Sequence, residues 1–264
     1  MIARMLGLGP KKPSYLAIAE YWVYLPDQKL PPQDVVLARM IRNNPFQQGE
    51  EPPITPREGL FFSDIRLDTA LVLREKNPHL FRPDLFEEHI EPTAEALEAL
   101  SEASAFAKLR YASDEPLRDD RHLQFLPYYA EALAYYARAS IAFDSVGERL
   151  LEMENLRERL RANPEAALPD LHLRTVWQQT ARGGAAATRG LMKIGLPEIE
   201  TPESPSEHRT VICGVLEEAA LKLWEAKELS EEVTVPYFED EFHVRLTPRR
   251  REPAIARIHR VQQA

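Results

Sequence analysis

The chain has 264 residues, 44% of them hydrophobic and 28% charged, with a formal net charge of −9 and a pI near 5.4. This length supports a stable globular core, and the acidic balance argues against general nucleic-acid binding, which uses a basic face. The single cysteine, Cys213, excludes an intramolecular disulfide.

No apolar stretch approaches the roughly 20 residues that span a bilayer. The basic residues near the N-terminus are not followed by the apolar run of a signal peptide. We therefore expect a cytoplasmic protein with no membrane association.

Apolar and aromatic residues predict an alternation of strands and helices in the first part of the chain. Thr93 is a plausible N-cap for the second helix, and a proline-rich loop is expected over 43–59. The predicted strands are 14–25, 65–74, 106–111 and 140–143. The predicted helices are 34–41, 94–103, 123–139 and the charged, amphipathic 146–161.

The second part of the chain predicts a strand over 171–179, a long helix over 207–228 and three final strands over 234–238, 242–246 and 255–261. This order favours an α+β fold: a mixed sheet with helices packed on it and a C-terminal β-meander. We expect one domain over 1–264, built as two lobes if it is divided, with the boundary near 146–165.

The segment Thr188–Glu200 is the most distinctive feature, because four of the 10 glycines fall between Gly183 and Gly195. Glycine permits positive φ and the close backbone approach of phosphate cradles. However, the lysine of a phosphate loop and the glycine spacing of a dinucleotide site are both absent. The pattern favours a structured turn that lines a surface, and its candidate residues are Thr188, Arg189, Gly190, Gly195, Pro197, Glu198 and Glu200.

Two carboxylates end this segment. In an extended chain, Glu198 and Glu200 project from one face. Such a pair can serve as acid and base or hold a cation. The simpler expectation is an exposed pair on the solvent face of an edge strand.

Four tyrosines recur at a seven-residue interval in the predicted helix 123–139, and they are Tyr128, Tyr129, Tyr135 and Tyr136. This spacing predicts two pairs along one helix face. Tyrosine is enriched at protein interfaces, so the stripe is a candidate interface; a half-buried core stripe is the commoner cause.

The remaining reactive residue types form no recognisable site. The seven histidines have no zinc-type spacing, so no metal and no cofactor are expected. His243 lies beside the acidic run 239–241, which reads as a solvated turn, although a cation could sit there. Cys213 lies in an apolar helical run and reads as a buried thiol. The C-terminal arginines from Arg245 to Arg260 read as a solvated or internally paired face.

The run T-R-G-L-x-x-x-G-x-P-E-I-E at 188–200, placed after a strand and before a long helix, resembles a bacterial family known only as a domain of unknown function. The resemblance extends from about residue 14 to 262. It implies that the motif belongs to a shared scaffold, and it brings no activity and no catalytic residues.

The leading functional hypothesis is a non-enzymatic interaction protein of the accessory, regulatory or immunity type, with a protein partner. A hydrolase or metal-dependent enzyme that uses Glu198 and Glu200 is the second hypothesis. The third is a nucleic-acid-associated protein that uses the arginine-rich C-terminus.

Overall fold

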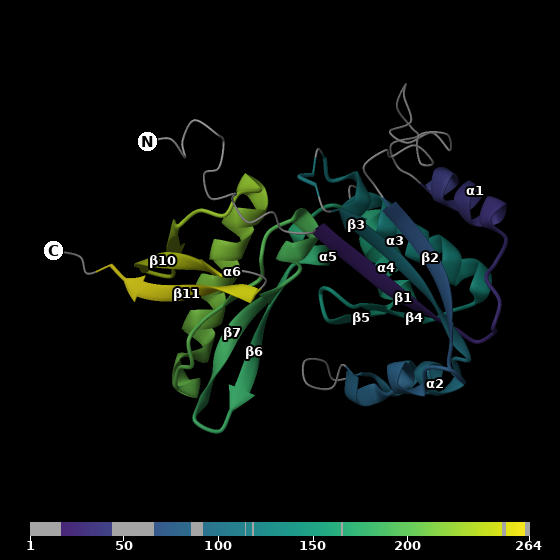
Figure 1. The fold of residues 1–264 in the computed structure, drawn as a ribbon, viewed down its shortest axis with the longest axis horizontal. Coiled ribbons are helices and arrows are strands. Elements are labelled where there is room, and N and C mark those ends of the chain that lie inside the picture. Colours follow the sequence, from purple (N-terminus) through teal and green to yellow (C-terminus); the bar gives the residue numbers. More distant parts are fainter. Residues whose placement is uncertain are drawn as a thin grey trace, which may run out of the picture.

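The computed structural model describes residues 17–43, 66–85, 92–113, 115–117, 119–164, 166–249 and 252–261. It contains two β-sheets that lie side by side, each with helices packed on it (Figure 1). The predicted α+β class and the C-terminal meander are confirmed. The single mixed sheet of the prediction is instead divided into one antiparallel and one mixed sheet.

The first sheet has five antiparallel strands in the order β2-β3-β1-β4-β5. Their bounds are β1 Ala17–Leu25, β2 Arg66–Leu73, β3 Ala105–Ser113, β4 Ile141–Asp144 and β5 Arg149–Glu152. Alternation along β1 explains why the sheet buries two faces: Tyr21 and Val23 face one core, whereas Trp22 and Tyr24 face the other.

Helices cover both faces of this sheet. The face that carries Tyr21 packs against α1 (Gln33–Asn43), α3 (Arg121–Ala137) and α4 (Met153–Ala162). The opposite face packs against α2 (Ala94–Glu102) and the short 3₁₀ turn η3 (Pro78–Phe81), which another turn, η4 (Pro83–Leu85), follows. Thr93 caps α2 as predicted, since its hydroxyl oxygen accepts the N–H of Ala96 at 3.2 Å.

The second sheet has six strands in the order β6-β7-β8-β11-β10-β9. Their bounds are β6 Arg174–Thr180, β7 Gly183–Arg189, β8 Ile199–Glu200, β9 Glu232–Tyr237, β10 Asp240–Arg249 and β11 Glu252–Arg260. Only the β8–β11 pair is parallel. The long helix α6 (Arg209–Ala226), preceded by η6 (Ser206–His208), packs on one face through a core that includes Leu216, Leu223 and Val244.

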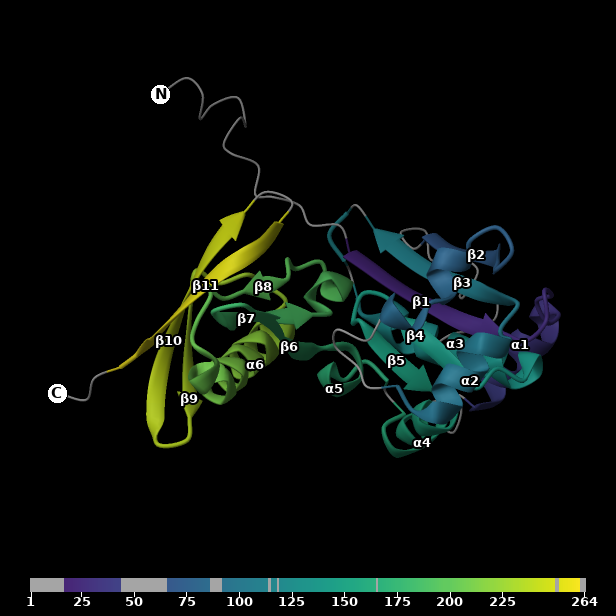
Figure 2. The same ribbon diagram turned by 90° about the horizontal axis from the view of Figure 1, so that it is seen from below.

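The chain passes from the first sheet to the second between Glu152 and Arg174, through α4 and the one-turn helix α5 (Pro169–His172). Figure 2 shows α5 at the junction of the two sheets. The 3₁₀ turn η5 (Leu191–Ile194) belongs to the second half of the chain but packs against β1. The junction is therefore built by short elements from both halves.

Three sequence expectations need correction. The helix expected over 146–161 begins only at Met153, because 149–152 pairs with β4 as β5. The strand expected over 171–179 begins at Arg174, after the turn of α5. Residues 183–189 form a strand that was not predicted. Most of the proline-rich loop expected over 43–59 lies outside the described residues.

Within the described ranges, no helix is long and apolar enough to cross a membrane.

Candidate functional site: the junction of the sheets and the groove along β5

The segment that begins at Thr188 closes into a turn around one carboxylate. Glu198 accepts hydrogen bonds from the N–H groups of Gly190 at 2.7 Å and Met192 at 3.2 Å, and from the hydroxyl of Thr188 at 2.8 Å. Burial raises the pKa of Glu198, and these three donors oppose the increase. The Glu198 carboxylate therefore stabilises the turn by accepting these three hydrogen bonds.

The glycines occupy the conformations that this turn requires. Gly190 has φ 114° and Gly195 has φ 78°, both in the region that glycine favours. A Cβ at Gly190 would lie 2.0 Å from the carbonyl oxygen of His172. These dihedral angles confirm the predicted structured turn, but the expectation that it lines a surface is wrong, because Thr188, Gly190 and Pro197 are buried. Pro197 is buried beside Glu198.

The predicted exposed pair of carboxylates is wrong. Glu198 is only 8% exposed, because its side chain turns inward to the backbone donors. Glu200 lies on β8 and forms a salt bridge with Arg249 at 2.5 Å. The two carboxylates thus have different partners, and the turn does not bring them together as an acid–base pair.

The same turn carries a lysine into the junction of the sheets. Lys193 on η5 is fully buried, and its ammonium group is hydrogen-bonded to Asp144 at the end of β4. Asp144 also accepts the N–H of Gly147 at 2.9 Å. Desolvation lowers the pKa of Lys193, and the attraction of Asp144 opposes that decrease. This ion pair joins the two halves of the chain.

Two buried histidines complete the cluster. His172 on α5 donates from Nε2 to the carbonyl of Ala166 at 2.6 Å, so its Nδ1 is an acceptor. This Nδ1 lies 3.4 Å from the hydroxyl of Tyr21 and 3.5 Å from Nζ of Lys193. His122 stacks on Tyr111 and donates to the Lys193 carbonyl at 2.7 Å. Burial lowers the pKa of both imidazoles, which are therefore neutral near pH 7.

The turn between β4 and β5 makes further polar contacts across the junction. Glu148 lies 2.7 Å from Nε of Arg189, and its carbonyl accepts a hydrogen bond from Arg174 at 2.9 Å. Arg149 donates to the carbonyls of Asp170, Leu171 and Leu173 at 2.8 to 3.1 Å. The β4–β5 hairpin thus contacts the second half of the chain, as β1 does.

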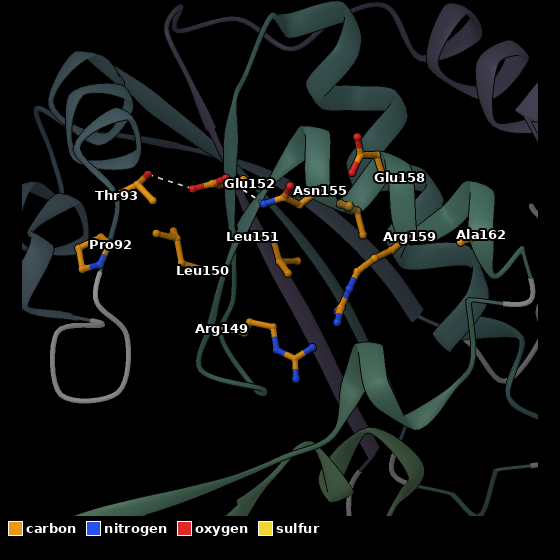
Figure 3. A pocket seen from close by; sticks show the side chains of 11 residues that line it. Pro92, Thr93, Arg149, Leu150, Leu151, Glu152, Asn155, Glu158, Arg159 and Ala162 are labelled. Atoms are coloured by element: carbon orange, nitrogen blue, oxygen red, sulfur yellow. Dashed lines mark hydrogen bonds between the residues drawn. The ribbon is translucent and has the colours of Figure 1, made fainter.

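A groove of about 680 Å³ runs beside β5 (Figure 3). Its walls come from the start of α2, from β5 and from α4. Its lining residues are Pro92, Thr93, Arg149, Leu150, Leu151, Glu152, Asn155, Leu156, Glu158, Arg159 and Ala162. The Glu152 carboxylate lies at one end of the groove, where it accepts hydrogen bonds from the Thr93 hydroxyl and the Asn155 amide, both at 2.9 Å. Arg149 and Arg159 lie on the side away from that end.

The strand in this groove presents a free edge, because β5 is the last strand of its sheet. The N–H of Met153 donates to the carbonyl of Ser140 at 2.8 Å. Bonded pairs alternate along an antiparallel ladder, so Leu151 bonds to β4 and the N–H and C=O of Leu150 point away from it. Among the residues that the structure describes, these two groups have no hydrogen-bonding partner.

The four tyrosines of α3 do not form one stripe. Tyr128 and Tyr129 are buried, whereas Tyr135 and Tyr136 are 51% and 40% exposed. The difference arises along the helix axis: Tyr128 and Tyr129 are part of the core of the first sheet, while Tyr135 and Tyr136 lie in the last turn of the helix. The guanidinium of Arg39 lies 3.5 Å from the ring centre of Tyr135. Only Tyr135 and Tyr136 therefore remain candidates for an interface.

The other sequence candidates lie on the second sheet. His243 contacts Glu232 at 2.7 Å. The described part of the chain contains no group of three or more histidine, cysteine, aspartate or glutamate side chains that could hold a metal ion. Arg249 and Arg260 form ion pairs, the latter with Asp240, as expected for an internally paired face. Cys213 is half-buried and not buried as expected, and this partial burial raises the pKa of its thiol.

Neither the junction cluster nor the groove could be found from a local sequence pattern. Lys193 lies inside the distinctive segment, but no neighbouring residue marks it as buried. Asp144, His172 and Arg149 come from three other elements, so no local spacing relates them. Comparison of the chain with models of protein families, with curated proteins and with solved structures found no match in any of the three, and the family resemblance at 188–200 stays a prediction.

Proposed function

We propose that this chain is a non-enzymatic interaction protein that binds an extended segment of a partner protein along the free edge of β5. The observation that carries this proposal is the groove in which the N–H and C=O of Leu150 point outward without a partner among the described residues. An added strand would satisfy both groups, and sheet edges are a recurrent recognition site for this reason.

The groove has the lining that such a segment needs. A strand directs alternate side chains to opposite faces. One set would meet Leu156 and Arg159 on α4, and the other would meet Pro92 and Thr93 before α2. Main-chain hydrogen bonds would supply affinity, and these two walls would supply specificity.

The enzymatic alternative receives less support from the same geometry. Both oxygens of Glu198 are occupied by donors of its own turn. Lys193, Asp144 and His172 are residue types that acid–base chemistry uses, but each is at most 1% exposed, so a substrate cannot reach them without opening the junction. We assign this cluster to holding the sheets together.

The test uses one position and two substitutions. Leu150→Pro removes the outward N–H and leaves the ladder to β4 intact, since proline is tolerated at an edge where its nitrogen faces away from the sheet. Leu150→Ala is the matched control, because it shortens the same side chain but keeps the N–H. Proteins captured from native lysate by the full chain are compared among wild type and both variants.

Wild type and Leu150→Ala should both capture one defined protein, and Leu150→Pro should not. In the complex, the Leu150 amide should be protected from hydrogen exchange. Equal capture by all three folded proteins would contradict the proposal. A protein lost equally from both variants would place recognition in the leucine side chain and would also exclude strand addition.

A further inference from the structure

The turn between β9 and β10 carries a phenylalanine, Phe238, whose exposure and backbone conformation are both unfavourable. Phe238 is 84% exposed, more than any other large hydrophobic residue that the structure describes. Its φ is 54°, in the left-handed region that glycine, asparagine and aspartate favour and that a bulky residue rarely adopts. Figure 2 shows the β9–β10 hairpin projecting from its sheet. Burial in the core of the described residues does not account for a phenylalanine here.

The Phe238 ring nevertheless packs against Tyr237, which is itself fixed on α6. Tyr237 packs on the backbone of α6 at Gly214, where an added Cβ would lie 2.2 Å from the tyrosine ring. The Tyr237 hydroxyl donates to the carbonyl of Thr210 at 3.4 Å. Phe238 then packs edge-on against Tyr237, with ring centres 4.6 Å apart. An aromatic side chain that is fixed before binding loses little conformational freedom on association.

The surroundings of this ring define the chemistry of its partner. Val211 on α6 is 39% exposed and lies one turn before Gly214, so it extends the apolar surface. Glu239 in the turn and Glu218, which lies one turn after Gly214 on α6, are both exposed. An apolar patch with an acidic rim complements a surface that combines apolar side chains with lysine or arginine. The same acidic rim disfavours an anionic membrane surface.

We propose that Phe238 is the anchor of a second docking surface, formed with Tyr237 and Val211, that binds a basic and apolar segment of a partner protein. Exposed, rigid aromatic residues are the usual energetic centres of such interfaces. This surface lies on the second sheet and does not depend on the groove along β5.

The experiment separates binding from folding, because glycine and asparagine suit the backbone at position 238 better than phenylalanine does. A random-peptide phage library is selected on the immobilised full chain, and the clones are measured against wild type, Phe238→Gly and Phe238→Asn. Tyr136→Ser, which removes an exposed aromatic ring from α3, is the matched control. The melting temperatures of Phe238→Gly and Phe238→Asn should equal or exceed that of wild type.

The selected peptides should be rich in arginine or lysine and in apolar residues. Both Phe238 variants should bind them roughly 30-fold more weakly, while Tyr136→Ser binds them as wild type does. Failure to select any clone, selection of acidic clones, or equal binding by the Phe238 variants would overturn the proposal. Flotation with phosphatidylcholine vesicles that is lost in Phe238→Gly would also overturn it, in favour of a lipid surface.

Discussion

Lys193 on η5 and Asp144 on β4 form an ion pair that links the two halves of the chain, and neither side chain is more than 1% exposed. His172 and Tyr21 lie beside the pair, where Nδ1 of His172 is within 3.5 Å of both Nζ of Lys193 and the Tyr21 hydroxyl, and both side chains are buried. A buried charge is tolerated only while its partner is present. The stability of the junction therefore depends on both charges together.

Replacing one member of this pair should be more harmful than replacing both. Lys193→Met leaves the Asp144 carboxylate buried without a counter-charge, and the free energy of unfolding should fall by about 3–5 kcal/mol. The double variant Lys193→Met/Asp144→Asn removes both charges and keeps an acceptor for the N–H of Gly147. Urea unfolding should show that it recovers much of the loss. Additive losses from the two single changes would contradict this coupling.

Stability should decrease as the pH falls below about 6.5. Burial lowers the pKa of His122 to about 4, because desolvation outweighs the hydrogen bond to the Lys193 carbonyl. The unfolded chain, in which histidine has a pKa of about 6.5, therefore binds more protons than the folded chain at pH 5, and stability is lost as the pH decreases through this window. His122 alone should contribute about 2 kcal/mol to the loss between pH 7 and pH 5.

The measurement is the urea midpoint at pH 7 and pH 5 for wild type and His122→Gln. Glutamine keeps a donor for the Lys193 carbonyl and does not titrate, so this variant should show a smaller decrease on acidification. Burial also lowers the pKa of His172, so the His122→Gln variant should keep part of the pH dependence of stability. Identical pH dependence in the wild type and in His122→Gln would refute the assignment.

The carboxylate of Glu198 should be replaceable by an amide but not by a methyl group. Burial raises the pKa of Glu198, so its charge is unfavourable in the folded state, and Glu198→Gln should change the free energy of unfolding by less than about 1 kcal/mol. Glu198→Ala leaves the N–H groups of Gly190 and Met192 without an acceptor and should cost about 2–4 kcal/mol. Thermal unfolding of the two variants distinguishes this role from one that requires the charge.

The two glycines of the turn should respond differently to alanine. Gly190→Ala meets both a positive φ and the carbonyl of His172 at 2.0 Å, and should cost more than about 3 kcal/mol or prevent folding. Gly195→Ala carries the cost of the left-handed conformation, about 1–2 kcal/mol. Circular dichroism melts of the two variants, made in parallel, test this order; a larger loss at Gly195 would contradict it.

Much of the fold could be predicted from the sequence where local patterns and tertiary contacts agree. The strands β1, β2 and β3 and the C-terminal meander follow from alternating apolar residues, and α6 follows from its long apolar stripe. The strand β5 could not be predicted, because Leu150 and Leu151 continue the helical spacing of α4. Pairing with β4 through the turn at Gly147 decides its conformation instead.

The candidate sites also include features that a local sequence pattern predicts and features that it does not. The turn at Gly190 and Gly195 could be predicted, since positive φ leaves a glycine signature. The burial of Glu198 could not, because glutamate is almost always exposed and nothing local marks the exception. The cluster of Lys193, Asp144 and His172 is assembled from residues distant in the chain.

The position of β11 has a consequence for how the protein is made. This strand lies between β8 and β10, in the interior of the second sheet, although it comes after both of them along the chain. The first sheet uses only strands up to Glu152 and can form while the ribosome is still translating. The second sheet cannot close until Arg260 has emerged, so a nascent or truncated chain that lacks β11 exposes the edges of β8 and β10 to aggregation and to proteases.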